Sequence, residues 1–312
     1  MALFPAPILT DGATHSAQQF RLLVRDLARD AEGITRGTDL KVSQLGTPGT
    51  SVQVGDGSGV IRGRYNAWQG HYAVCNIGSV QVPIAATGGS GRSDMVILRV
   101  EDPEYEGSLN PAIDQIAYFQ VISNVSSSAT AIPDGRTGIP LARIDIPAST
   151  STITDAMIKD IRQIANPRRE RTVSTQSPTA LSTEITGSSG TFTNFSTAAG
   201  WSIAVPSWAS TVRIVLTVAQ IRYSTNTFFG GLRATFGSSL TVQAVNLDDN
   251  QTGIRRGTVA TADTLTIPSA YRGTTQTLRL QAAGYPSNTT GRVGVDASTA
   301  LIADVDFGEA PR

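Results

Sequence analysis

Few side chains of this sequence are suited to catalysis. Its 312 residues include two histidines, His15 and His71, and one cysteine, Cys75, and they contain no Gly-x-Ser-x-Gly nucleophile motif. Four residues separate His71 from Cys75, so on a strand the two would lie on one face about 13 Å apart, too far for a thiol–imidazole pair. Acidic pairs such as Asp102 with Glu104 have same-face strand spacing, at which solvated edge residues are commoner than glycosidase carboxylates. We therefore expect no enzymatic activity and no cofactor.

Aromatic and polar residues in the C-terminal half indicate a binding chemistry instead. Sugar binding requires flat aromatic rings for the apolar side of a pyranose and convergent polar groups for its hydroxyls. Such residues flank the Ser-Thr-Asn-Thr loop at 224–227 and recur at 248–250. The predicted glycan-contact residues are Tyr223, Asn226, Phe228, Phe229, Asp248, Asp249 and Asn250. The alternatives are that these rings belong to a hydrophobic core or to a subunit interface.

Part of this region also matches the first half of a calcium-binding loop. Asp248, Asn250 and Gly253 occupy its first, third and sixth positions. The twelfth position is Val259, which cannot supply the bidentate carboxylate that such a loop requires. We interpret the segment as a polar hairpin turn and predict no metal site.

The composition argues against several classes of partner. Basic and acidic residues number 25 each, so no excess of positive charge favours the phosphates of nucleic acids. No apolar run reaches the roughly 20 residues that cross a bilayer, and the N-terminus lacks the basic and apolar regions of a secretion signal. We therefore expect synthesis in a cytoplasm, without nucleic-acid binding and without membrane insertion.

The first predicted element is a helix at about 16–34, where apolar residues recur at three- and four-residue spacings. Charged residues occupy the opposite face of this helix. The apolar stripe packs either against its own domain or against copies of the chain in an oligomer. In the second case the predicted interface residues are Phe20, Leu23, Val24 and Leu27.

From Lys41 onward the apolar period changes to two, which predicts a mainly β protein with two domains. Residues 1–171 form the first domain, with a second helix at about 153–164 and a basic hinge at its end. Residues 172–190 are rich in serine and threonine and are predicted to be a linker or an extended arm. Residues 191–312 are predicted to form an antiparallel β-sandwich of the jelly-roll kind.

The order of short segments in the first domain resembles that in minor tail proteins of tailed phages that infect actinobacteria. The segments are Asp-Leu-Lys-Val at 39–42, Gly-Thr-Pro-Gly at 46–49, Val-Ile-Arg-Gly-Arg at 60–64, Gln-Gly-His-Tyr at 69–72, Gly-Arg-Ser-Asp-Met-Val at 91–96, Glu-Asp-Pro-Glu-Tyr at 101–105 and Ile-Pro-Leu-Ala-Arg-Ile at 139–144. The resemblance covers about residues 10–171.

This resemblance implies a virion protein, an adaptor at the tail tip or baseplate that presents a variable C-terminal domain. It also implies a homotrimer that contacts other phage tail proteins. Such a particle would bind a repetitive cell-wall carbohydrate of the host through several weak sites acting together. Two alternatives remain open: an adaptor that contacts only virion proteins, and a component of an injection device related to phage tails.

Overall fold

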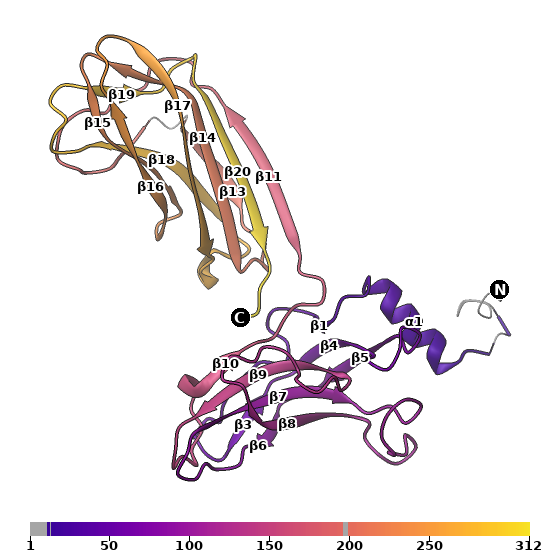
Figure 1. The fold of residues 1–312 in the computed structure, drawn as a ribbon. Coiled ribbons are helices and arrows are strands. Elements are labelled where there is room, and N and C mark those ends of the chain that lie inside the picture. Colours follow the sequence, from indigo (N-terminus) through magenta and orange to yellow (C-terminus); the bar gives the residue numbers. More distant parts are fainter. Residues whose placement is uncertain (1–10, 13, 196–198) are drawn as a thin grey trace. The chain divides into compact units, whose positions relative to one another are not determined.

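The computed structural model describes residues 11–12, 14–195 and 199–312. It contains two compact units (Figure 1). Unit 1 comprises Met1–Pro167 together with Ala310–Arg312, and unit 2 comprises Arg168–Glu309. Both are built mainly from antiparallel strands, which confirms the predicted fold class.

The helix of unit 1, α1 (Ala17–Leu27), begins where the sequence predicts and ends earlier. Ser16 caps its N-terminus, accepting a hydrogen bond from the Gln19 backbone, while the Gln19 side chain accepts one from Ser16. The predicted end at 34 is wrong because Arg29 and Asp30 adopt left-handed backbone angles, with φ of 54° and 61°. Their N–H groups donate to the last helical carbonyls, which closes the helix seven residues early.

The described residues of unit 1 form three sheets whose inner faces share one apolar core. The first has the order β1 (Gly33–Ile34), β4 (Gly57–Arg62), β5 (His71–Asn76), and the second has the order β2 (Val42–Gln44), β3 (Ser51–Val54), β6 (Val80–Pro83). The third has the order β10 (Ile158–Asp160), β9 (Gly138–Ile146), β7 (Arg92–Val100), β8 (Ala117–Val125). The centre of this sheet, β7, is buried along almost its whole length, as its continuous apolar run indicates.

The second predicted helix, at 153–164, is absent. A single 3₁₀ turn, η1 (Asp155–Met157), leads into strand β10, in which Ile158 pairs with Ile144 of β9. Ile153, which begins the apolar periodicity, is 1% exposed and forms a bridge to Gly49. Strand pairing and core burial therefore override a helical spacing carried by β-branched isoleucines.

Unit 2 is a jelly roll of two antiparallel sheets. Its eight main strands form four antiparallel pairs that enclose one another along the sequence. The first strand pairs with the last, and the two middle strands form a hairpin. The pairs are β11 (Arg169–Gln176) with β20 (Ala300–Gly308), β13 (Gly200–Ala204) with β18 (Thr275–Gly284), β14 (Thr211–Ser224) with β17 (Arg255–Thr266), and β15 (Phe228–Phe236) with β16 (Leu240–Asp249). The short strands β12 (Thr193–Asn194) and β19 (Arg292–Gly294) pair with β18 and β14.

The jelly roll begins earlier than predicted, because the supposed linker supplies its first strand. All eight residues of β11 pair with β20, including 172–176, which the sequence assigns to a linker or arm. The basic hinge residues Arg168 and Arg171 form ion pairs with Glu309 and Asp304 at 2.7 Å. A Thr-rich strand at the edge of a sheet lacks the apolar alternation from which strands are predicted.

Candidate functional site

The first candidate site is the apolar stripe of α1. Phe20, Leu23 and Leu27 lie at three- and four-residue spacings and are 50%, 37% and 73% exposed. Val24, the fourth predicted interface residue, is half-buried. Phe20 and Val24 border a hollow against β5, whereas Leu23 and Leu27 lie toward solvent, so much of the stripe stays unburied within unit 1, as the oligomer interpretation requires.

The side of α1 that faces the unit is held by a charged residue. Arg21 is the one buried residue of α1, and its Nε donates to the backbone carbonyl of Gln69 at 2.9 Å. Its guanidinium lies 3.2 Å from the buried carboxylate of Asp102 and 2.5 Å from the exposed carboxylate of Glu104. It also lies over the ring of Tyr105, 5.2 Å from the centroid. Burial lowers the pKa of Arg21, but the hydrogen bonds to Glu104 and Tyr105 outweigh it, so the net pKa is raised.

Further hydrogen bonds fix the partners of Arg21. The Tyr72 hydroxyl donates to Asp102 at 2.7 Å and accepts from the Gln69 side-chain amide at 3.0 Å. Burial, together with the hydrogen bond to Asp102, raises the pKa of Tyr72. Gly70, at φ +80°, approaches α1 so closely that a Cβ there would lie 2.6 Å from the Arg21 carbonyl carbon. The helix is therefore seated on a tightly specified polar surface.

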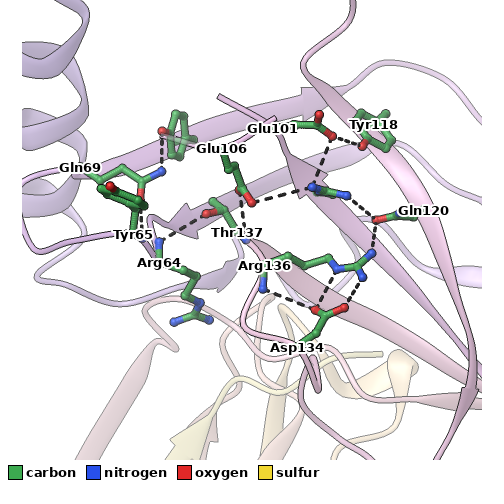
Figure 2. A network of polar contacts seen from close by, with 12 residues as sticks. Arg64, Tyr65, Gln69, Glu101, Glu106, Tyr118, Gln120, Asp134, Arg136 and Thr137 are labelled. Atoms are coloured by element: carbon green, nitrogen blue, oxygen red, sulfur yellow. Dashed lines mark hydrogen bonds and ion pairs between the residues drawn. The ribbon is translucent and has the colours of Figure 1, made fainter. Parts of the chain in front are cut away.

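A chain of polar contacts continues from this seat across the sheet (Figure 2). Gln69 accepts from the Tyr65 backbone at 2.8 Å, and the neighbouring Arg64 backbone donates to Thr137 at 3.3 Å. The Thr137 backbone donates to Glu106 at 3.3 Å. Arg99 contacts Glu106, Glu101 and Gln120, and the Tyr118 hydroxyl donates to Glu101. Arg136 then connects Gln120 to Asp134. These contacts tie the 64–69 loop beneath α1 to strands β7 and β8.

In unit 2 the structure overturns two of the predicted glycan contacts. Tyr223 is 8% exposed and Phe228 is 0% exposed, and both belong to the jelly-roll core. For Tyr223 the cause is a β-bulge at Gln220, whose φ is +61°, and for Phe228 it is the alternation of β15, whose even-numbered residues face the core. Upstream, buried positions such as Val218 are even-numbered, whereas downstream the odd-numbered Ile221 and Tyr223 face inward. Burial raises the pKa of Tyr223 to about 12.

The remaining predicted residues do gather at one end of the jelly roll. Phe229 pairs with Asp248 across β15 and β16. Arg255 forms an ion pair with Asp249, and it donates to the carbonyls of Asn226 and Gly253 at 2.7 Å. Asn250 is exposed directly after β16. Arg255, a further polar residue of this region, therefore joins the two loops.

The exposed side of the second sheet carries an aromatic group that joins Phe229 of the predicted set to two rings outside that set. The half-buried rings of Phe229 and Tyr285 lie 5.5 Å apart, and Phe192 lies 6.5 Å from Tyr285. Arg233 stacks 4.1 Å over the Phe192 ring. Tyr285 crosses Gly231, where a Cβ would lie 2.3 Å from its hydroxyl. The Gly-Gly pair in β15 was the available signal that a side chain lies against this strand.

No helix among the described residues is long and apolar enough to cross a membrane. No protein-family model matches the chain, and no curated protein matches it.

Solved structures similar to the chain include that of infectious bursal disease virus Gx strain, at 14% identity and a TM-score of 0.24, covering 90% of this chain and 81% of that one. The T13 particle of the same virus matches at 13% identity and 0.26, covering 95% and 86%. A Bacillus thuringiensis Cry1Da tryptic core variant matches at 10% identity and 0.21, covering 96% and 56%. At TM-scores this low the similarities carry no argument about function.

Proposed function

We propose that this chain is a non-enzymatic structural protein of a virion, a minor tail protein at the tail tip or baseplate of a tailed phage. The ordered segments within residues 10–171 support this proposal. A jelly roll joined to an assembly unit is consistent with it, since jelly rolls occur in viral shells and lectins. The chain is made in the host cytoplasm and takes its place in the particle with other tail proteins.

The observation that carries the proposal is the exposed apolar stripe of α1 on a rigid polar seat. A helix held by Arg21 presents Phe20, Leu23 and Leu27 to solvent. Exposed apolar residues at helical spacing are the usual means by which helices of separate subunits associate. Three copies meeting along this stripe give the homotrimer, and neighbouring tail proteins occupy the rest of unit 1. The molecular mass of the full chain in solution tests this assembly.

The proposed role of unit 2 is contact with a host cell-surface glycan. Phe229 and Tyr285 offer ring surface, and Asn226, Asp248 and Asn250 at the same end offer polar groups for hydroxyls. Trimeric presentation on a particle raises the effective concentration against a repetitive polymer.

Binding of the full-length chain to intact actinobacterial cells tests this role. The variant Phe229→Ala with Tyr285→Ala should abolish saturable binding, while Val173→Ala, an exposed apolar residue on the other sheet, should leave it unchanged. Equal binding by both variants would remove Phe229 and Tyr285 from the site. No binding by any form would favour the alternatives, an adaptor contacting only virion proteins or a part of a phage-tail-like injection device.

A further inference from the structure

A cavity of about 770 Å³ opens beside the C-terminal end of α1 in unit 1. Its walls come from the end of α1, the end of β4, the loop after β4 and the start of β5. This volume lies within the range of small-molecule binding sites, roughly 300–1,000 Å³. Neither the assembly stripe of α1 nor the jelly roll uses it.

Arginine dominates the charged lining of this cavity. Four arginines face it, Arg25, Arg29, Arg62 and Arg64, against two aspartates, Asp26 and Asp30. Arg62 lies 3.4 Å from Asp30, and Arg64 pairs with Glu32 at 2.6 Å. Even with Glu32 included, four guanidinium groups face three carboxylates, so one positive charge is left over. Planar guanidinium groups match the oxygens of phosphate in a bidentate manner.

A buried imidazole forms part of the same lining. His71 is 1% exposed, and neither of its ring nitrogens makes a hydrogen bond of good geometry within the described chain, although the Asp30 backbone lies close to the ring. Its Nε2 lies 3.6 Å from the Asp30 carboxylate, beyond hydrogen-bond length. Buried polar atoms are almost always paired, so an unpaired imidazole against a cavity points to a ligand that completes it.

We propose that this cavity binds the phosphate group of a small ester, such as a sugar or polyol phosphate, through Arg29, Arg62 and His71. Phosphate supplies acceptor oxygens for the guanidinium forks and for an imidazole N–H together. The remaining volume accommodates the alcohol part of the ester, for which Asn66 offers polar contacts. This inference is independent of the particle to which the chain belongs.

The proposal implies that binding and protonation of His71 are linked. Burial lowers the pKa of His71, and the charge of Arg62 adds to this, while the Asp30 backbone and the carboxylates of Asp30 and Glu32 act in the opposite direction. A bound anion favours the imidazolium form and raises that pKa. Affinity for a phosphate diester should therefore increase as the pH falls from 8 to 5.5. A diester is needed here because a monoester itself titrates near pH 6.

The test uses calorimetry of the full-length chain at constant ionic strength, with glycerol phosphate, inorganic phosphate, a dialkyl phosphate diester and acetate as probes. We expect saturable binding of the three phosphate probes and none of acetate, with glycerol phosphate tighter than inorganic phosphate. Arg29→Gln and Arg62→Gln should each weaken binding about tenfold, the effect of losing one charge-assisted pair. Arg36→Gln, an exposed arginine of unit 1 outside the cavity, should have no effect.

Imidazole NMR gives the second readout, because the His71 resonances should shift and its pKa should rise when the diester is bound. The assignment is overturned if no phosphate probe saturates, if acetate binds equally well, or if Arg29→Gln and Arg62→Gln bind as tightly as the unaltered chain. Binding without any change at His71 would remove His71 from the site. Equal affinity for inorganic phosphate and glycerol phosphate would restrict the ligand to free phosphate.

Discussion

Arg21 fixes the position of α1 on unit 1. A buried charge is stable only when oppositely charged and hydrogen-bonding groups surround it, so the side chain must stay among its partners. The guanidinium replaces the apolar contacts that usually fix an amphipathic helix, and it leaves the apolar residues of α1 available for other contacts. The helical periodicity of the sequence identifies the apolar stripe, but it does not predict that a charged residue anchors the helix to unit 1. By periodicity alone, Arg21 belongs to the solvated face.

Replacing Arg21 by alanine should strip Asp102 of its countercharge and lower the free energy of unfolding of unit 1 by roughly 3 kcal/mol. Arg25→Ala is the matched control on the same helix. Its pair with Asp26 is exposed, so the change should stay within about 0.5 kcal/mol. Urea denaturation and amide hydrogen exchange of α1 measure both effects. Equal stabilities of the two variants would show that Arg21 is not the anchor.

The buried phenol of Tyr223 should make the stability of unit 2 depend on pH in the alkaline range. Its pKa is raised from 10 to about 12, so the folded state holds the proton more tightly than the unfolded state does. The corresponding stability is fully present below pH 10 and is lost as the pH rises toward 12, by roughly 2 to 3 kcal/mol. Tyr223→Phe should remove this part of the pH dependence, as measured by urea denaturation between pH 9 and 12. Parallel curves for the two proteins over that range would contradict the assignment.

At the scale of elements, the sequence predicts best where the pattern is local. The start of α1 follows from Ser16 and Gln19, and the even-numbered core residues of β14 follow from simple alternation. The incorrectly predicted elements share one cause, because a strand distant in the sequence determines the conformation of each segment. The strand β11 exists because β20 lies beside it, and β10 exists because β9 does.

The Tyr223 and Phe228 predictions failed for a backbone reason. A loop rich in polar residues suggests exposed rings, but the bulge at Gln220 turns Tyr223 inward, and the alternation of β15 places Phe228 in the core. No sequence pattern predicts that a glutamine adopts the left-handed backbone conformation. Aromatic type alone marks Phe229 and Tyr285 as candidate rings, but their contact with each other and with Phe192 could not be predicted, because the three residues lie far apart in the sequence.

Two glycines of the jelly roll differ in the space around them, so their replacement by alanine should affect stability differently. A Cβ on Gly230 would lie 2.1 Å from the Ala283 carbonyl oxygen, so Gly230→Ala should destabilise unit 2 by about 2 kcal/mol or more. A Cβ on Gly257 of β17 would meet only the Tyr223 ring, at 3.5 Å. Gly257→Ala should therefore be neutral to within about 1 kcal/mol. Thermal unfolding separates the cases, and similar losses in both would contradict the packing.

At the scale of the whole molecule, the chain passes between its units twice. Unit 2 begins at Arg168 and ends at Glu309, and 310–312 return to unit 1, where the Arg312 backbone donates to the Gly37 carbonyl at 2.8 Å. The jelly roll is therefore inserted between two segments of unit 1 rather than appended to it. In the proposed virion role, unit 1 assembles and unit 2 is presented to the host.

The most direct test of this assignment is the molecular mass of the full-length chain in solution, measured by light scattering over a concentration series. We predict a mass of three chains, reduced to one by Leu23→Ser with Leu27→Ser and unchanged by Ile113→Ser, an exposed apolar residue outside α1. A chain that stays monomeric at every concentration, or a trimer that survives the double substitution, would contradict assembly through α1.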